Sequence, residues 1–378
     1  MSRQGAKATM GDTVRILFFA DAASVHTRRW VAAVAERGGR AVVVSREAGE
    51  VPGADEVIVV QPGQDKLGWF KALPKIRAIS REVAQRFQPT LVHGHYVTSY
   101  GMWAAACGVA VPKVLTAWGS DILVTPRESR LMRLIVNWSL HHADLITADS
   151  MDMLHAIARY HPAAPCYQIL WGADTDKFVP AEPAADFEIV SLRSWEPNYN
   201  IDVILEAFAR VVAQRPQTAA RLHLLGGGPL AEALRQQAAR LGVQDHVQFH
   251  GRVGDAAMVQ AIQRSRASVS IPTSDATSVS VLESMACGLP IIASDLPANR
   301  QWLDERGGFL VPVRDVDAVT RALLTVLDAP EQARQMGQFN QQRIEREASR
   351  RGQMDAMWRL YQKLLMPVPV KVRDKARA

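Results

Sequence analysis

Two carboxylates in the second half of the chain have a spacing that could do chemistry. Asp275 and Glu283 lie eight positions apart in SIPTSDATSVSVLESMACGLPIIASD, residues 270–295. This pattern predicts a strand, a loop carrying Asp275, a helix carrying Glu283 and a further strand. Unpaired N–H groups and the macrodipole at the start of a helix favour an anion. The segment therefore offers a phosphate seat between two carboxylates, which suits a diphosphate joining two sugars; a capped surface helix is the alternative.

A glycine-rich turn precedes this segment. Gly226, Gly228 and Ala231 match the pattern G-x-G-x-x-A between an expected strand and an expected helix, and such a turn lets the backbone approach a nucleotide. A nicotinamide dehydrogenase would also need a carboxylate about 20 residues further on. The segment HVQFHG has His250 there and no carboxylate, so the sequence disfavours a dehydrogenase.

Other residues with metal or nucleophile chemistry carry weaker signals. Asp174 and Asp176 form a D-x-D pair that could bind a divalent metal, but the pair falls between the expected domains, and we interpret it as a capped turn. His93 and His95 alternate near a strand end, and we expect their side chains to face different ways. Neither H-E-x-x-H nor G-x-S-x-G occurs, so we expect no metal site and no serine hydrolase.

Short apolar runs alternate with helical patterns, which is typical of parallel strands buried on both faces. In the first half, the expected strands cover residues 14–20, 41–45, 57–60, 90–95, 113–118, 144–149 and 167–170. A Pro-, Ala- and Asp-rich stretch at about 172–186 interrupts the alternation. In the second half, the expected strands cover residues 187–193, 221–227, 246–251, 267–272, 290–295 and 308–312.

This organisation predicts two α/β domains in tandem. We place a Rossmann-like N-terminal domain at 1–178 and a Rossmann-like C-terminal domain at 179–349. Residues 366–378 form a basic tail with too little apolar content to fold, and we expect it to be flexible. Ligands of open parallel sheets bind outside the carboxyl ends of the strands, so we expect a central cleft between the domains.

Composition narrows the functional classes. With 378 residues, of which 48% are hydrophobic and 22% charged, the chain is long enough for two globular domains and unlike a disordered or fibrous chain. Its three cysteines lie far apart, which argues against a disulfide framework and fits a reducing cytoplasm. No apolar stretch approaches 18 residues and no signal peptide is recognisable. The net charge of +6 favours an anionic partner.

The segment DATSVSVLESMACGLPIIASD resembles the E-x7-E region of the family-four retaining glycosyltransferases, which have the GT-B fold of two Rossmann-like domains facing a central cleft. SLRSWEPNYNIDVILEAFA, HLLGGGPLAEAL and VQFHGRV are similar to other segments of the family's second domain, and LVHGHYVTSYG, TAWGSDIL and QILWGADTDKF to segments of its first. Asp275 stands where the family usually has glutamate, and Ser278 where it usually has glycine. The resemblance implies that a helix at about 350–365 packs back onto the N-terminal domain.

The resemblance also implies roles for individual residues. Arg193 would neutralise the departing nucleoside diphosphate, because a guanidinium can bind two phosphate oxygens at once. Asp275 would bind hydroxyls of the donor sugar, and Glu283 would bind the ribose. Asn198 occupies the position of a family lysine. The expected catalytic residues are thus Asp275 and Arg193, the expected donor-binding residues Glu283, Thr277, Ser278, Val279, Gly226, Gly227, Asn198 and Val253, and the expected acceptor-side residues His95, Ser120 and Asp121.

The implied reaction is transfer of a sugar from a UDP- or GDP-linked donor to an acceptor hydroxyl with retention of configuration. The resemblance implies that the reaction uses no protein nucleophile, no metal and no further cofactor. The implied acceptor is a glycan or a lipid-linked glycan, as in polysaccharide or glycolipid biosynthesis. Two alternatives remain: a nucleotide-sugar epimerase or phosphorylase of the same fold, and a non-catalytic subunit that binds nucleotide-sugars.

Basic and aromatic residues are mixed in residues 65–83, where Lys66, Lys71 and Lys75 accompany Trp69 and Phe70. Further arginines occur at Arg127, Arg130 and Arg133. Such a mixture suits an anionic membrane face, and the alternative is a helix whose aromatic residues pack inward. No nucleic-acid-binding motif accompanies these charges. We therefore expect a cytoplasmic protein, with a membrane inner face as a candidate partner and no nucleic acid.

Overall fold

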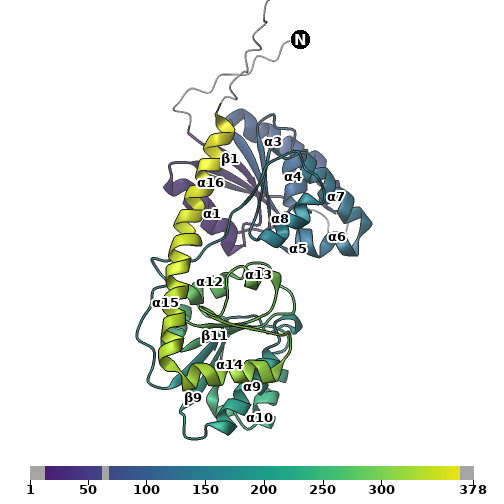
Figure 1. The fold of residues 1–378 in the computed structure, drawn as a ribbon. Coiled ribbons are helices and arrows are strands. Elements are labelled where there is room, and N and C mark those ends of the chain that lie inside the picture. Colours follow the sequence, from purple (N-terminus) through teal and green to yellow (C-terminus); the bar gives the residue numbers. More distant parts are fainter. Residues whose placement is uncertain (1–12, 62–67, 367–378) are drawn as a thin grey trace, which may run out of the picture. The chain divides into compact units, whose positions relative to one another are not determined.

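The computed structural model describes residues 13–61 and 68–366 of the chain. The chain divides into two compact units (Figure 1). Unit 1 comprises the described residues of Met1–Ala148, Met153–Ile169 and Met354–Ala378, and unit 2 comprises Asp149–Asp152 and Leu170–Gln353. The N-terminal residues 1–12, Lys66 in the basic segment and residues 367–378 of the expected tail lie outside the described residues.

Unit 1 is built on a parallel sheet of seven strands in the order β3-β2-β1-β4-β5-β6-β7. The strands are β1 (Arg15–Phe19), β2 (Arg40–Ser45), β3 (Glu56–Val59), β4 (Leu91–His95), β5 (Lys113–Ala117), β6 (Leu145–Ala148) and β7 (Cys166–Gln168). The helices are α1 (Val25–Glu36), α2 (Gly68–Lys71), α3 (Leu73–Arg86), α4 (Tyr100–Ala106), α5 (Ser120–Leu123), α6 (Thr125–Glu128), α7 (Arg130–His141) and α8 (Met151–Ala158).

Unit 2 is built on a parallel sheet of six strands in the order β10-β9-β8-β11-β12-β13. The strands are β8 (Phe187–Ser191), β9 (Ala220–Leu225), β10 (Val247–Gly251), β11 (Ala267–Ser270), β12 (Ile291–Ser294) and β13 (Gly308–Val311). The helices are η1 (Pro197–Tyr199), α9 (Ile201–Gln214), α10 (Ala231–Arg240), η2 (Gln244–His246), α11 (Asp255–Arg264), α12 (Val279–Ala286), α13 (Pro297–Arg300), α14 (Val316–Asp328) and α15 (Pro330–Glu347).

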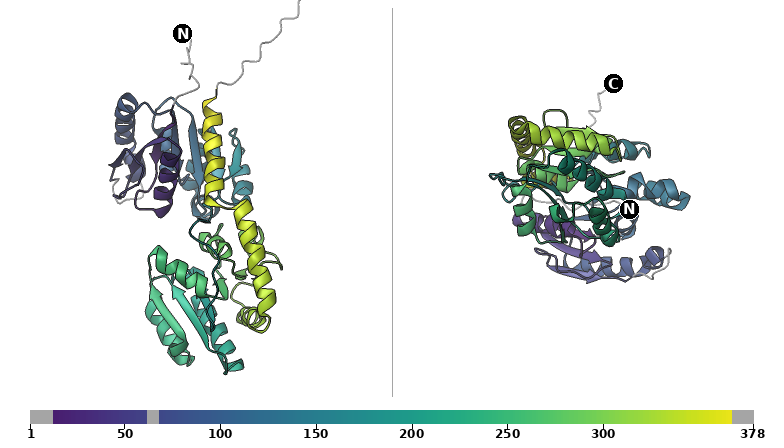
Figure 2. Two further views of the ribbon diagram at one scale, coloured as in Figure 1. Left: turned by 90° about the vertical axis from the view of Figure 1, so that its left-hand side faces the viewer. Right: turned by 90° about the horizontal axis from the view of Figure 1, so that it is seen from below.

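Helices cover both faces of each sheet (Figures 1 and 2). The central strands are therefore apolar on both faces: every residue of β8 is buried, as are four of the five residues of β1. In unit 2, the α9, α10 and α14 side of the sheet forms one apolar core, and the α11, α12 and α15 side forms another. The structure thus has the α/β architecture and the two Rossmann-like sheets that the alternating pattern predicts.

The strand order reverses once in each sheet. In unit 1 the reversal lies between β1 and β4, and in unit 2 it lies between β8 and β11. Loops that leave neighbouring strands in opposite directions open a crevice at such a switch point, where open parallel sheets bind ligands. The switch points therefore indicate where each unit would hold a ligand.

The division between the units differs from the predicted boundary near residue 178. The structure divides the chain at Ile169 and Leu170, because Leu170, Ala173 and Phe178 pack in a core of unit 2. The last helix, α16 (Arg350–Leu365), begins in unit 2, and its residues from Met354 onward belong to unit 1.

Candidate active site

The loops that follow β8 and β11 meet at the switch point of unit 2. Arg193 lies two residues after β8, and Asp275 lies five residues after β11. Nη2 of Arg193 donates a 2.8 Å hydrogen bond to Oδ2 of Asp275. The fold therefore brings the two expected catalytic residues into direct contact.

The same guanidinium reaches the start of α12. Nη1 of Arg193 donates to Oγ of Ser278 at 2.5 Å and to Oγ of Ser280 at 3.4 Å. Ser278 is the N-cap residue of α12, and its hydroxyl accepts a hydrogen bond from the amide of Val281. The positive charge of Arg193 thus lies beside the helix end that already favours an anion.

Neighbouring groups fix the position of Arg193. Its guanidinium carbon lies 4.3 Å from the centre of the Tyr199 ring, which is within range of a cation–π interaction. A Cβ atom at Gly226 would lie 2.3 Å from the carbonyl oxygen of Arg193, so only glycine permits the end of β9 to approach this backbone. Arg193 is consequently 9% exposed although it carries a full charge. The arrangement holds the guanidinium in place before a ligand arrives.

The electrostatics of Asp275 reflect this position. Burial raises the pKa of the Asp275 carboxyl, and the nearby Arg193 guanidinium opposes the rise. A buried carboxylate remains charged only if it is paired and hydrogen-bonded. Oδ1 of Asp275 accepts from the amide of Ala276, and Oδ2 accepts from Arg193. A ligand hydroxyl would add a further donor to the carboxylate.

Unused donors surround this cluster, which we call the anion seat: Arg193, Asp275, Ser278, Ser280 and the first turn of α12. In the described part of the chain, the amides of Val279 and Ser280 have no acceptor. The buried hydroxyls of Ser191 and Ser270, at the ends of β8 and β11, likewise have no partner among the described residues. Because buried polar groups are normally hydrogen-bonded, this edge of the sheet is equipped for a polar, anionic ligand.

Asn198 has a structural task instead of the charge that the family's lysine would supply. Its side-chain amide donates to the carbonyl of Ser274 at 2.9 Å and accepts from the amide of Ser274 at 3.1 Å, while its own carbonyl accepts from Thr273 at 2.8 Å. Asn198 therefore clamps the loop that carries Asp275. Within the seat, Arg193 is left as the residue that supplies a full positive charge.

The other expected donor-binding residues lie around the anion seat to different degrees. Glu283 is 4% exposed and lies on α12, about 7 Å along the helix axis from Ser278. The hydroxyl of Thr277 donates to the carbonyl of Asp149, so this side chain ties the loop to a segment of unit 2 that precedes α8. Val253, after β10, packs against the core beneath α12.

The glycine-rich turn has the predicted strand–turn–helix context, since β9 ends at Leu225 and α10 begins at Ala231. The carbonyl of Gly227 accepts from the amide of Trp195, and a Cβ at Gly228 would lie 2.4 Å from the Trp195 carbonyl. The turn therefore serves as a close backbone contact between the loops after β8 and β9.

In unit 1, the expectation that His93 and His95 face different ways is wrong. Residues i and i+2 of a strand point to the same face, and the two rings lie 4.7 Å apart. Both rings also contact Trp30 edge to face, and the ring of His95 contacts Trp118. The expected acceptor-side histidine is therefore part of a buried aromatic cluster at the switch point of unit 1.

A directed chain of hydrogen bonds fixes the tautomer of His93. The indole of Trp30 can only donate, and it donates to Oη of Tyr361 at 2.9 Å. The buried Tyr361 hydroxyl needs an acceptor for its own proton, and Nδ1 of His93 lies 2.6 Å away. With Nδ1 accepting, Nε2 of the neutral His93 ring donates to Thr116 at 2.6 Å. This series of hydrogen bonds joins α16 to the sheet of unit 1 and keeps His93 neutral.

Burial dominates the acid–base behaviour of this cluster. It lowers the pKa of His93 well below its usual value, and the charge of His95 adds to the effect. It lowers the pKa of His95 to about 3 and that of His26 to about 4, with smaller contributions from His26 and Arg29 respectively. These three histidines are therefore neutral at pH 7, and none carries a positive charge toward a ligand.

The other two acceptor-side candidates differ in burial. Asp121 is buried, and its carboxylate accepts from the amides of Val97 at 2.7 Å and of Trp118 and Gly119 at 3.0 Å each. Burial raises the pKa of Asp121, and these amides oppose the rise. Asp121 thus ties the loop after β4 to the loop after β5, whereas Ser120, the first residue of α5, is exposed.

The D-x-D pair lies in unit 2 and is bound by arginines of α16. Arg350 forms a hydrogen-bonded ion pair with Asp174, and Arg351 forms one with Asp176 at 2.6 Å. These partners give both carboxylates a structural role at the start of α16. Throughout residues 13–61 and 68–366, no three His, Cys, Asp or Glu side chains are grouped so that they could hold a metal ion.

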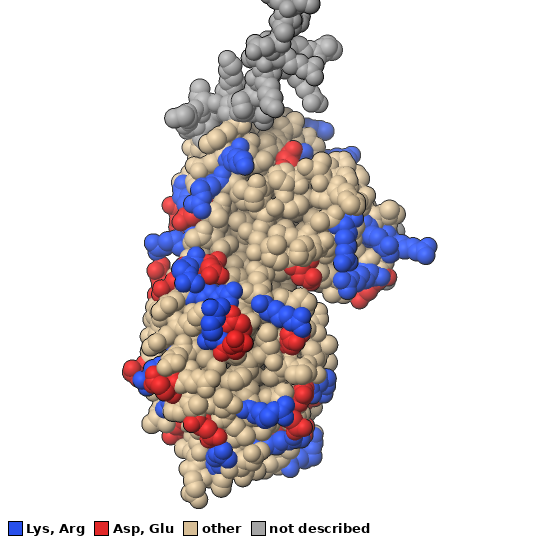
Figure 3. All heavy atoms as spheres, viewed as in Figure 1, with Lys and Arg blue, Asp and Glu red and all other residues tan. Residues whose placement is uncertain are grey.

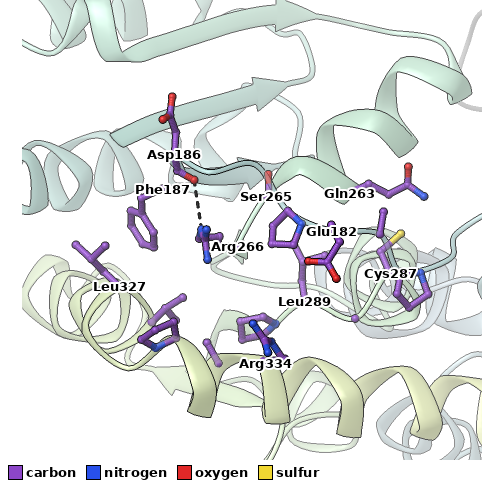
Figure 4. Close-up of a pocket in the computed structure, with 18 of the residues that line it drawn as sticks. Glu182, Asp186, Phe187, Gln263, Ser265, Arg266, Cys287, Leu289, Leu327 and Arg334 are labelled. Carbon is purple, nitrogen blue, oxygen red and sulfur yellow. Dashed lines mark hydrogen bonds between the residues drawn. The ribbon is translucent and has the colours of Figure 1, made fainter. Parts of the chain in front are cut away.

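A cavity of about 570 Å³ opens at the opposite, amino-terminal edge of the unit 2 sheet (Figure 4). Phe187 and Leu289 line it, and Arg266 donates there to the carbonyl of Asp186 and to two preceding carbonyls. Its acidic side chains, Glu182 and Asp186, balance Arg266 and Arg334 in number. The cavity therefore shows no preference for an anion, and it lies away from the anion seat.

Sequence reasoning missed several residues that build the two sites. Ser280 and Tyr199 both contact Arg193, and Tyr361 joins α16 to His93. The sequence TSVS could have pointed to Ser280, because a serine in the first turn of a helix lies on the same side as the N-cap serine and can bind the same anion. No local pattern pairs Tyr361 with His93, since 268 positions separate them.

Comparisons with known proteins show which family the chain resembles. The model of the family described as glycosyl transferases group 1 matches residues 173–343, and the model described as glycosyl transferase 4-like matches residues 15–150. A GDP-mannose-dependent alpha-(1-6)-phosphatidylinositol monomannoside mannosyltransferase of Mycolicibacterium smegmatis is 29% identical over 220 residues. This match spans 52% of the present chain and 56% of the relative, so the chain aligns with just over half of the relative's length.

Solved structures agree on the fold. Sucrose-phosphate synthase from Thermosynechococcus elongatus has a TM-score of 0.76 at 19% identity, covering 93% of this chain and 99% of that one. Anabaena HepE in complex with UDP has a TM-score of 0.76 at 16% identity, covering 93% of this chain and 100% of that one. Two Rossmann-like sheets and two matching family models lead to one assignment: the chain belongs to the glycosyltransferases of the family-four type, with the GT-B fold.

Proposed function

We propose that the protein transfers a sugar from a UDP- or GDP-linked donor to an acceptor hydroxyl, with retention of anomeric configuration. The observation that carries the proposal is the anion seat, in which the Arg193 guanidinium is held between Asp275 and the N-terminus of α12. A nucleoside diphosphate gains negative charge on its phosphates as it departs. A fixed cation and helix amides aimed at that charge stabilise the transition state more than the ground state.

The proposed step needs no covalent bond to the protein. The bond between the anomeric carbon and the donor phosphate oxygen breaks, and the acceptor oxygen bonds to the same carbon from the same face. The acceptor proton passes to the departing phosphate oxygen. Asp275 would orient the donor sugar through its hydroxyls, and Arg193 with the amides of Val279 and Ser280 would neutralise the phosphates, so we propose that the reaction requires no metal.

The proposed acceptor is a glycan, free or lipid-linked. The relative from Mycolicibacterium smegmatis is named for a phosphatidylinositol mannoside acceptor and a GDP-mannose donor, and HepE was solved with UDP. These names support a nucleoside diphosphate donor and a role in polysaccharide or glycolipid biosynthesis. Ser120, which is exposed and follows β5 at the carboxyl-end edge of the unit 1 sheet, is the proposed first contact of the acceptor.

A ligand screen followed by product analysis tests the proposal. Thermal unfolding is measured with a panel of nucleoside diphosphates and sugar nucleotides, because a tight ligand of the folded state raises the unfolding temperature by mass action. The donor identified in this way is then incubated with and without glycan acceptors and with inorganic phosphate. We expect acceptor-dependent transfer, with the anomeric configuration of the donor kept in the product.

Other outcomes would contradict the proposal. Epimerised donor without an acceptor, or sugar phosphate formed from inorganic phosphate, would indicate a different reaction at the same seat. Ligand binding without transfer or donor hydrolysis would indicate a binding subunit. Loss of activity in EDTA that Mn²⁺ restores would contradict the metal-independent step.

A further inference from the structure

Helix α7 carries apolar side chains on its outer face. Leu131, Leu134 and Trp138 are 48%, 66% and 39% exposed, and their i, i+3, i+7 spacing puts them on one stripe of the helix. Val124, just before α6, is 41% exposed. Exposed apolar groups gathered in one place usually mark an interaction surface. We call these four residues the α7 patch.

The remaining side of α7 already has its partners. Ile135, Val136 and Leu140 are buried in the cores of unit 1. The helix is therefore anchored without the α7 patch, and Leu134 and Trp138 are not needed to hold it against the sheet.

Arginines without acidic partners border the α7 patch. Arg127, Arg130 and Arg133 are exposed, and none of them forms an ion pair with any described residue. Glu128 is the single acidic side chain between Val124 and His142. Figure 3 shows Lys and Arg gathered on the surface over α6 and α7. The patch thus combines exposed apolar groups with a net positive charge.

The basic segment at 65–83, which the sequence offers as a membrane face, has a different structure in its described part. Trp69, Phe70 and Ile76 pack against the core of unit 1, and the indole of Trp69 lies 4.4 Å from that of Trp103. The described aromatic residues of this segment therefore point inward, as its alternative interpretation expects. The exposed apolar side chains of the α7 patch lie instead on α7 and just before α6.

We infer that the α7 patch docks on an anionic lipid bilayer. Leucine and tryptophan bordered by arginine is the mixture that enters the boundary between lipid headgroups and acyl chains. In the ranges that the structure describes, none of the helices combines the length and the apolar character that a membrane span requires. Arg127, Arg130 and Arg133, which form no ion pair within the described part of the chain, provide the charge complementarity to acidic headgroups.

The location of the α7 patch deepens the proposed function, on which this part of the inference rests. Val124 lies four residues after Ser120, the proposed first contact of the acceptor, and α5 connects them. A bilayer at α6 and α7 would therefore meet unit 1 next to its acceptor edge. An acceptor that is anchored in the same membrane could then present its sugar there while its lipid remains in the bilayer.

Vesicle co-sedimentation of the full chain tests the inference. The vesicles contain phosphatidylcholine alone or a mixture of seven parts phosphatidylcholine to three parts phosphatidylglycerol, and no donor is added. We expect binding to the anionic vesicles only, with a partition coefficient that falls as salt is raised. The double variant Leu134→Glu, Trp138→Glu should lower that coefficient more than about tenfold. The matched control is Val179→Glu, Val313→Glu, which changes two exposed valines of unit 2.

A second pair of variants tests the charge alone. Arg130→Gln and Arg133→Gln should each weaken binding about fivefold, whereas Arg240→Gln and Arg321→Gln, at exposed arginines of unit 2, should leave it unchanged. These substitutions do not touch the core, so they remain informative if the glutamate variant fails to fold. Circular dichroism and the unfolding shift with UDP or GDP show that each variant is folded.

Three results would overturn the inference. The first is the absence of binding by the wild type to anionic vesicles, and the second is equal binding by the wild type and the patch variants. The third is a concentration-dependent dimer that the patch variants abolish, because it would assign the α7 patch to a second copy of the chain. Each of these results leaves donor binding and transfer to a soluble acceptor untouched. Failure of this inference is thus distinguishable from failure of the proposed function.

Discussion

The guanidinium of Arg193 donates a 2.8 Å hydrogen bond to the carboxylate of Asp275, although 82 positions separate the two residues. The contact exists because β8 and β11 are neighbours in the sheet and both residues lie in the loops at their carboxyl ends. The two groups that would meet the phosphates and the sugar of a donor are thus positioned by each other. A change in either residue therefore disturbs the other.

Replacement of Asp275 by alanine should lower turnover on the order of 100-fold. The hydroxyls of the donor sugar lose the carboxylate that accepts their hydrogen bonds, and Arg193 loses its ion-pair partner. Steady-state kinetics with the donor identified by the unfolding screen measures the effect. Asp275→Glu, which supplies the residue common in the family, should recover part of the turnover. The control is Asp295→Ala, which removes a surface ion pair with Arg300. Turnover equal to the wild type in Asp275→Ala would exclude the carboxylate from the reaction.

Replacement of Glu283 by glutamine should act mainly on donor affinity. Its carboxylate lies along α12 from the seat and is proposed to bind the ribose hydroxyls, which are held equally in the ground and transition states. We expect a donor Kd raised about tenfold, measured by calorimetry, with a smaller change in turnover. The control is Glu232→Gln at an exposed position of α10. Unchanged affinity would show that Glu283 is a packing residue of α12.

Replacement of Asn198 by alanine should loosen the loop that carries Asp275. Two hydrogen bonds to the Ser274 backbone disappear, and each is worth about 1 kcal/mol. We expect a lower free energy of unfolding for unit 2 and a lower turnover, both relative to Asn137→Ala at an exposed site of α7. Asn198→Lys tests whether missing positive charge or the geometry of the Asp275 loop limits the reaction. If charge were limiting, the lysine variant would be faster than the wild type. We predict that it is not faster.

Unit 1 should lose stability in mild acid because of its buried histidines. The pKa of His95 is about 3 in the folded protein and about 6.5 when unfolded, so the unfolded chain binds more protons between these values. The contribution of His95 to the free energy of unfolding is therefore fully present above pH 6.5. It falls as the pH decreases toward 3, by at most about 1.4 kcal/mol per pH unit. His95→Gln should reduce the difference in unfolding free energy between pH 7.5 and pH 5 by about 2 kcal/mol.

Hydrogen exchange of unit 1 peptides at the two pH values measures this difference without assuming that both units unfold together. The control is His161→Gln, at an exposed position after α8. An unchanged pH dependence in His95→Gln would mean that the ring is solvated enough to titrate normally.

The sequence predicts the architecture well, because the signal for it is local. Each buried strand is a short apolar run, and Ser278 at the start of α12 is a recognisable N-cap, so the strand–loop–helix context of Asp275 and Glu283 is confirmed. To predict the contact between Arg193 and Asp275, one must also know the strand order, which places β8 beside β11. Family resemblance supplied that step for Arg193.

The parts that the sequence did not predict depend on side chains that meet across the fold. The inward packing of Trp69 and Phe70 and the exposure of Leu134 and Trp138 follow from which face of a helix meets the sheet. Composition alone is similar in both segments. The clamp of Asn198 on Ser274 is equally invisible, because an asparagine in a loop has many partners within reach.

The central claim is that a diphosphate binds at the anion seat. A crystal structure of the protein with its UDP- or GDP-sugar tests it most directly. The account predicts phosphate oxygens within about 3 Å of the Arg193 guanidinium and of the amides of Val279 and Ser280, with the sugar hydroxyls on Asp275. A ligand bound in the cavity beside Phe187 and Leu289, or anywhere else with these groups unoccupied, would contradict the account.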